Sequence, residues 1–383
     1  MGYDALTGVH NRKLMAASSP PLARPLSLYL DCCRLLAALL VVVSHYGPFG
    51  VITRGADAWV PDLGREAVMV FFVLSGFVIA YTTEQKNQSL RAYCLARCTR
   101  IYSVALPVLL LSFLGAGLLV ALGEADTERF YQLAKPWLYL PLHLLFMGEL
   151  WTISETPPLL APYWSLGFEV WYYVLFGALF YLRGRRRLVV GGSLFLLLGP
   201  KLWLLLPVWA SGVLLYRWQK THTLARRPAL LGWLATLVLL AAFKLSGLDT
   251  GLRELARATW PFPAVPLKSA DRYLADYLVC LLVLANFWCA RHAGFTRLLR
   301  FERPIRALSA YTFTLYLVHA LVIGLWLGLY AHDPASGADV ALLSVLIVLA
   351  TWGLGQLTEH RRHWFQAGFE RLAARVRPAP ARW

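Results

Sequence analysis

The sequence predicts an all-α, polytopic membrane protein, a helical bundle with about ten transmembrane helices and one short re-entrant or interfacial segment. Composition is the first observation behind this prediction, because 58% of the 383 residues are hydrophobic and only 15% are charged. Ordinary soluble domains are less apolar and more charged. Apolar runs near the bilayer-spanning length also recur along the chain. Finally, the basic residues gather in the short segments between those runs, as they do in cytoplasmic loops.

The net charge and the cysteines exclude several classes of site. A charge of +16 would suggest nucleic-acid binding in a soluble protein, but its distribution between apolar runs indicates a lipid bilayer as the partner and no nucleic acid. The six cysteines lie in or beside the apolar runs. Their spacing predicts neither a disulfide framework nor a metal site.

Apolar runs of helix length predict the spans in chain order. They are 26–47, 66–83, 101–122, 163–182, 188–199, 202–216, 229–246, 273–290, 307–330 and 340–358. The two short spans 188–199 and 202–216 are expected to hinge at Gly199–Lys201. We expect a cytoplasmic N-terminal tail (1–25), one transmembrane domain (26–358) and a basic cytoplasmic tail (359–383). No small-residue cleavage site precedes the first span, so that span is expected to remain as an anchor.

Loop charges predict the topology, because positive loops stay in the cytoplasm. The positive segments are 84–100, 183–187, 217–227, 291–306 and 359–383, and the non-positive ones are 48–64, 123–135, 149–162 and 331–339. The positive segments fall inside and the non-positive ones outside, in alternation, if segment 136–150 does not cross the membrane. This segment is short and contains Pro136 and Pro141, which suit a non-crossing element. Ten crossings with both termini inside follow, and eleven crossings are the alternative. Loop 244–272 is expected outside despite its positive charge.

Within the first span, the stretch Leu30–Tyr46 carries three ionisable groups: Asp31, Arg34 and His45. Arg34 and His45 are eleven residues apart, close to three helical turns, so their side chains point from one face and lie about 16 Å apart along the axis. Charges inside a span usually mark a protein interior or a pathway. The predicted topology places His45 at the outer end and Arg34 in the inner half.

Each of these residue types suits a defined chemistry. Histidine titrates near neutral pH, so His45 is a candidate general base; the alternative is an interfacial histidine bonded to a loop. The planar guanidinium of Arg34 suits phosphate, whereas the simpler interpretation is an ion pair with Asp31 at i,i+3 spacing. Arg97 and Arg100 are expected at the inner mouth, as phosphate ligands or as positive-inside anchors.

Two further ionisable residues lie inside predicted spans. Glu169 is costly in an apolar helix unless it is paired. It is expected to accept from His45, to stabilise Arg34 or to bind a hydroxyl, and the alternative is a structural bond to Tyr163 or Tyr172. His319 is expected near the membrane centre. The sequence favours neither a structural role in packing nor a functional role for this residue.

Several segments resemble, in order, those of the integral-membrane acyltransferase-3 family. The match covers about residues 28–358. Leu30–His45 resembles the family's Arg-x10-His signature. The other matching segments are Phe71–Phe77 (FFVLSGF), Arg97–Tyr102 (RCTRIY), Trp164–Glu169 (WSLGFE), the weaker Pro207–Gly212 and Ser309–His319.

This resemblance implies an acyl-CoA-dependent O-acyltransferase of a bacterial inner or plasma membrane. The expected donor is acetyl-CoA, and the expected acceptor is a hydroxyl of a carbohydrate, cell-surface polysaccharide or glycolipid. We expect the CoA phosphates to bind Arg34, Arg97 and Arg100. His45 would act as base with Glu169 holding its imidazole, and Ser75 is a candidate oxyanion donor. A covalent acyl-enzyme stays open. The alternatives are a transporter or channel that uses the same polar line as a permeation path, and a non-catalytic membrane scaffold.

Overall fold

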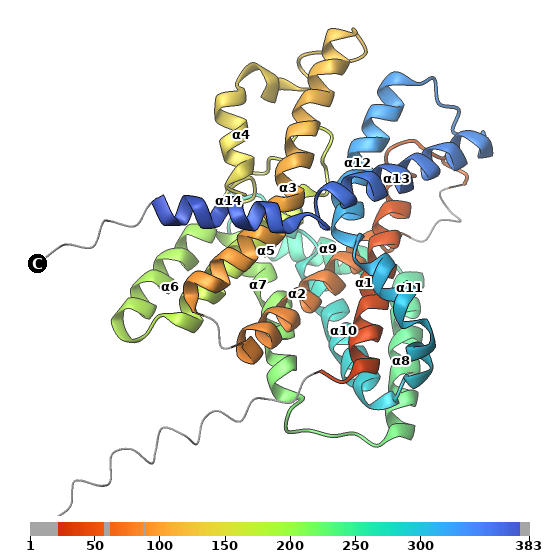
Figure 1. The fold of residues 1–383 in the computed structure, drawn as a ribbon. Coiled ribbons are helices and arrows are strands. Elements are labelled where there is room, and N and C mark those ends of the chain that lie inside the picture. The colour runs from red at the N-terminus through yellow and green to blue at the C-terminus, as the bar shows by residue number, and fades with distance from the viewer. Residues whose placement is uncertain (1–21, 57–61, 87–88, 376–383) are drawn as a thin grey trace, which may run out of the picture.

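The computed structural model describes residues 22–56, 62–86 and 89–375, and every regular element in these residues is a helix (Figure 1). The α-helices are α1 (Arg24–Ser44), α2 (Gly64–Lys86), α3 (Leu90–Ala121), α4 (Pro136–Leu144), α5 (Tyr163–Tyr181), α6 (Gly184–Leu198), α7 (Pro200–Trp218), α8 (Arg226–Leu245), α9 (Leu248–Ala258), α10 (Tyr273–Ala293), α11 (Glu302–Ser309), α12 (Thr312–Leu329), α13 (Gly337–Leu357) and α14 (Arg362–Arg375). The 3-10 helices are η3 (Tyr131–Ala134), η4 (Lys268–Ala270) and η5 (Thr296–Phe301). Most of the predicted N-terminal tail and the last eight residues of the C-terminal tail lie outside the described residues.

Length and apolarity identify the membrane-spanning helices. In the part of the chain that the structure describes, seven helices can cross a membrane: α1, α2, α3, α8, α10, α12 and α13. The bent pair α6 and α7 gives an eighth if it counts as one span. The predicted membrane helical bundle is therefore confirmed, while these criteria give seven or eight spans where the loop charges predict ten. The predicted span α5 is long enough to cross, with 19 residues. It is not among the seven helices, because its tyrosines and tryptophans lower its mean hydropathy.

The basic segment that we expected as the loop 84–100 is mostly helical. Helix α3 begins at Leu90 because Ser89 caps it: the Ser89 hydroxyl accepts a hydrogen bond from the backbone N–H of Ala92 at 3.3 Å. Arg97 and Arg100 are therefore fixed on a helix of 32 residues. The predicted span 307–330 is likewise divided, since α11 ends at Ser309 and α12 begins at Thr312.

Two predicted irregular segments agree with the structure. Helix α4 has nine residues, too few to cross a bilayer, so it fits the expected re-entrant or interfacial element. Between α6 and α7 the chain turns by 117°, at the expected hinge. Lys201 follows this turn with its ammonium fully buried, where it donates to the Glu149 carboxylate at 2.9 Å and the Ser154 hydroxyl at 2.7 Å.

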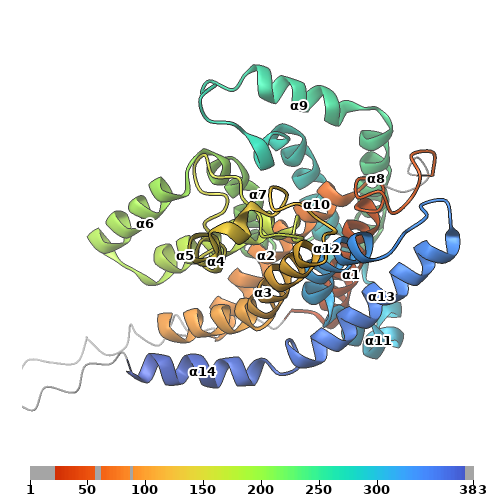
Figure 2. The same ribbon diagram turned by 90° about the horizontal axis from the view of Figure 1, so that it is seen from above.

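Helix α2 is the centre of the bundle. It packs on α1, α5, α7 and α10, and 67% of its most apolar window is buried, more than in any other span of the described residues. Helix α14 lies across α3 (Figures 1 and 2), with the rings of Tyr102 and Phe369 5.8 Å apart.

Two glycines allow α2 and α7 to pack backbone to backbone. A Cβ on Gly76 would lie 2.0 Å from the Trp209 carbonyl oxygen, and a Cβ on Gly212 would lie 2.0 Å from the Val73 carbonyl oxygen. No side chain fits at these distances. Small residues at such crossings are the usual means by which membrane helices approach closely.

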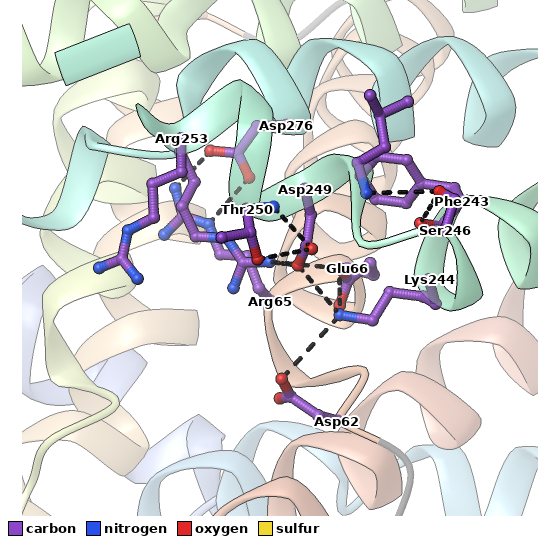
Figure 3. Close-up of polar contacts among 12 residues, drawn as sticks. Asp62, Arg65, Glu66, Phe243, Lys244, Ser246, Asp249, Thr250, Arg253 and Asp276 are labelled. Carbon is purple, nitrogen blue, oxygen red and sulfur yellow. Dashed lines mark hydrogen bonds and ion pairs between the residues drawn. The ribbon is translucent and has the colours of Figure 1, made fainter. Parts of the chain in front are cut away.

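An ion-pair cluster joins one end of the bundle to α9, which lies above α10 in Figure 2. It consists of Arg65, Glu66, Lys244, Asp249, Arg272 and Asp276 (Figure 3). Lys244, at the end of α8, contacts Glu66 of α2 at 3.1 Å and Asp249 of α9 at 3.5 Å. The start of α2, the end of α8 and the start of α10 thus share one face of the molecule, as the predicted alternation of spans requires.

Substitution of Gly212 by Ala should destabilise the protein. The added methyl meets a backbone carbonyl that cannot yield, and such overpacking costs about 1–3 kcal/mol. The control is Gly353→Ala in α13, where nothing lies within 4 Å of a Cβ. We expect a lower thermal unfolding midpoint in detergent for Gly212→Ala only. Equal midpoints for the two variants would contradict the backbone contact.

Asp249→Asn should loosen α9 in a pH-dependent way. Burial alone would raise the pKa of Asp249, but Lys244 and Arg272 more than offset it, so the pKa lies below its usual value. A carboxyl with a lowered pKa contributes stability above about pH 4, and this stability is lost as the pH falls through the folded-state pKa. We expect a thermal midpoint about 1–3 °C below wild type at pH 7, and no difference well below pH 4. The exposed Asp126→Asn is the control, and a gap that persists in acid would refute this account.

Candidate active site

A cavity of about 110 Å³ lies among α1, α2, α3, α5 and α12. Its polar lining consists of Asp31, Arg34, Ser75, Arg97, Arg100, Ser165, Glu169, Tyr173, Thr312 and Tyr316. Six of the eight residues that the sequence singles out therefore meet around one space. The remaining two, His45 and His319, do not line this cavity.

Arg34 is held by its own helix and by the last residue of α11. Its guanidinium pairs with Asp31 at 3.0 Å, as the i,i+3 spacing predicts, and donates to the Ser309 carbonyl oxygen at 3.2 Å. Asp31 also pairs with Arg306 at 3.0 Å. The Arg34 Nε is buried and has no partner among the described residues, so this guanidinium keeps a free donor.

Arg97 and Arg100 approach the same cavity from α3. The Arg97 guanidinium lies over the ring of Tyr173, 5.7 Å from its centroid, and its buried Nε also lacks a partner in the described part of the chain. Three arginines and two carboxylates line the cavity, and a third carboxylate, Glu359, interacts electrostatically with Arg34 and Arg100 from outside the lining. Such a site is suited to an anionic ligand.

Glu169 is fixed by hydroxyl groups. Its Oε1 accepts from the Ser75 hydroxyl at 2.7 Å and from the Tyr173 hydroxyl. Ser75 in turn accepts from the indole N–H of Trp209 at 3.1 Å. Tyr163 and Tyr172, the partners that we had considered for Glu169, instead donate to the carbonyls of His143 and Leu202. Because the one Ser75 proton goes to Glu169, this arrangement does not fit Ser75 as an oxyanion donor.

His45 follows the last residue of α1 and presents a defined tautomer. Its Nδ1 lies 2.7 Å from the Val41 carbonyl oxygen. A carbonyl oxygen only accepts, so Nδ1 carries the proton and Nε2 carries the lone pair. The imidazole is therefore oriented as a base by its own backbone, and no carboxylate bonds to it in the described residues.

His319 repeats the same arrangement on α12. Its Nδ1 lies 3.0 Å from the Leu315 carbonyl oxygen, and its ring centroid is 5.1 Å from that of His45. His319 is fully buried, and its Nε2 has no partner among the described residues. Two unprotonated Nε2 atoms cannot bond each other, so the pair needs a third group that donates a proton.

Aromatic contacts connect the histidine pair with the cavity. Tyr316 lines the cavity, and its ring centroid lies 6.3 Å from that of His319. Phe71, also in the lining, packs edge-on against Tyr316 at 5.6 Å. On the opposite side, the ring of Phe49 lies 5.0 Å from that of His45. A continuous line thus runs from the arginines through Tyr316 and both histidines to Phe49.

The geometry separates two groups that we expected together. Glu169 lies with the arginines, while His45 lies with His319 and Phe49, so the expected hydrogen bond from Glu169 to the His45 imidazole is not present. The sequence analysis also missed Trp209, Phe49 and Tyr173 as site residues. Only Tyr173 had a local signal, since it follows Glu169 by four residues on the same helix face.

The described residues do not form a candidate metal site. They contain no group of three or more His, Cys, Asp or Glu side chains that could hold a metal ion.

The apolar helices define an integral membrane protein, and its interior contains a cavity lined by three arginines. A family model described as an acyltransferase domain matches residues 27–355, most of the 383-residue chain. The chain therefore belongs to the acyltransferase-3 family, and with its membrane-spanning helices it is a membrane acyltransferase. No curated protein and no solved structure matched the sequence.

Proposed function

We propose that the protein transfers an acyl group, acetyl in the first instance, from acyl-CoA to a hydroxyl of a sugar, a cell-surface polysaccharide or a glycolipid. The observation that carries this proposal is the line from three cavity arginines to a histidine whose Nε2 is free to accept a proton. An anionic donor suits the arginine end, and a neutral hydroxyl suits the histidine end.

In this reaction Arg34, Arg97 and Arg100 bind the phosphates of CoA. The unpartnered Nε atoms of Arg34 and Arg97 are available as donors to the phosphate oxygens. Glu169 acts within the cavity, where Ser75 and Tyr173 hold its Oε1. Its negative charge balances part of the arginine charge and reduces the repulsion among the guanidinium groups. Asp31 does the same for Arg34 from the other side.

His45 then acts as the general base. Its Nε2 removes the proton of the acceptor hydroxyl while that oxygen attacks the thioester carbonyl carbon. The new C–O bond forms, the C–S bond breaks, and the CoA thiolate takes the proton from the imidazolium. His319 is a positioning residue in this proposal, because its ring packs beside that of His45 and its Nε2 has no other partner among the described residues.

The proposed setting is a bacterial inner or plasma membrane with both termini in the cytoplasm. The loop charges support this orientation. Arg97 and Arg100 then face the compartment that contains acyl-CoA, and His45 faces the compartment that contains the acceptor.

His45→Ala should abolish acetyl transfer. Loss of a general base lowers the rate by about 10²–10⁴-fold. The measurement is incorporation of labelled acetyl from acetyl-CoA into membranes that contain equal amounts of each variant. His222→Ala, an exposed histidine after α7, is the control. Near-normal turnover by His45→Ala would rule out the base assignment.

Arg97→Gln and Arg100→Gln should weaken the use of the donor. Each lost charged contact to phosphate should raise KM for acetyl-CoA by about tenfold or more. Both variants should also discriminate less between acetyl-CoA and its 3′-dephospho form. Arg91→Gln is the matched control, because Arg91 lies on the same helix but outside the cavity lining. Equal KM values for Arg91→Gln and the two cavity variants would show that these arginines only anchor α3.

A further inference from the structure

A second hollow, which we call the outer groove, lies beyond the histidine pair. Its volume is about 440 Å³, within the range of about 300–1,000 Å³ that is typical of ligand sites. Four segments form it: Pro48–Phe49, Arg129–Gln132, Thr156–Ala161 and one face of α12. The groove and the arginine-lined cavity have no lining residue in common, although α12 contributes to both.

The outer groove is connected to both histidines through two of its lining residues, Phe49 and Ala320. Phe49, in its lining, is the residue whose ring lies 5.0 Å from that of His45. On α12 the lining begins at Ala320, the residue after His319, and continues one and two turns further at Ile323 and Leu327. A molecule in this groove therefore lies next to the proposed base.

The wall made by Thr156–Ala161 is a fixed, strained structure. Leu159 has a φ of +59°, a left-handed conformation that bulky side chains rarely adopt. Strain of this kind persists where packing enforces it and is common at ligand-binding sites. Here the Leu159 side chain packs against Gly324 so closely that a Cβ at that glycine would lie 2.7 Å from Leu159 Cδ2.

The polar groups of the groove indicate the chemistry of its ligand. Arg129 is exposed, contacts the ring of Phe130 at 5.3 Å, and forms no ion pair with another described residue. Gln132 is 6% exposed, and its Oε1 is buried without a hydrogen-bond partner in the described part of the chain. The groove thus offers one free cation and one free acceptor among apolar walls.

We propose that the outer groove binds the acceptor and that the acceptor is an anionic saccharide. The apolar C–H face of a sugar ring packs on Phe49, one hydroxyl donates to Gln132 Oε1, and a carboxylate or phosphate of the sugar pairs with Arg129. Another hydroxyl then lies toward His45 Nε2. This inference rests on the proposed acyl transfer, and it adds the substrate class and the residues that select it.

The first experiment measures transfer of labelled acetyl by the full chain in proteoliposomes. The acceptor probes are methyl glucuronide, glucose 6-phosphate and neutral methyl glucoside. Arg129→Gln should raise KM for the two anionic probes by about tenfold or more, well beyond its effect on KM for methyl glucoside. Lys135→Gln is the matched control, because this nearby exposed lysine does not line the groove. Identical KM values for Arg129→Gln and Lys135→Gln would overturn the proposal.

A second experiment tests the groove without any acyl donor. Thr156→Cys is introduced into a chain whose six native cysteines are replaced by Ser or Ala, and it is labelled with a membrane-impermeant maleimide. Methyl glucuronide should slow this labelling several-fold, and Arg129→Gln should remove the protection. Protection without any acetyl transfer would support saccharide binding in the groove and refute the proposed function. Transfer that depends on His45 but not on Arg129, with no protection, would refute the groove alone.

Discussion

The backbone contact between α2 and α7 determines where the polar groups of the cavity lie. Gly76 and Gly212 bring the two helices so close that a Cβ at either position would be 2.0 Å from a carbonyl oxygen. Ser75 precedes Gly76, and Trp209 lies nearly one turn before Gly212. The contact therefore brings the Trp209 indole to 3.1 Å from the Ser75 hydroxyl, which in turn holds Glu169 at 2.7 Å.

Charge balance then gives the cavity its preference for anions. Asp31 is shared between Arg34 and Arg306, and Glu169 already accepts from two hydroxyls. Neither carboxylate has much capacity left for Arg97, whereas Arg100 and Arg34 also interact electrostatically with Glu359. Unpaired cations are costly inside a membrane protein, so the arginines retain part of their interaction energy for a ligand. A phosphate-bearing donor supplies the acceptors that the protein lacks.

The sequence predicted the helical class, most spans and the Arg34–Asp31 pair, because hydropathy and helical spacing are local properties. The short helix α4 also fits the predicted non-crossing segment 136–150, because nine residues are too few to span a bilayer. The start of α3 at Leu90 was missed because the Ser89 cap extends the helix into a basic segment. The partner of Glu169 and the contact of His45 with His319 depend on which helices pack together, and local spacing does not determine that.

Helix α1 separates the two ends of the proposed reaction by a fixed length. Arg34 lines the cavity, whereas His45 lies eleven residues further along the chain and contacts His319, which corresponds to about 16 Å of helix. Phe71 and Tyr316 stand between the two places. A compact donor bound at the arginines does not reach the histidine. A donor with a charged head and a long, slender arm reaches it with the head still bound, as the pantetheine arm of acyl-CoA allows. In the proposed reaction, the separation favours a long donor and the arginines favour an anionic one.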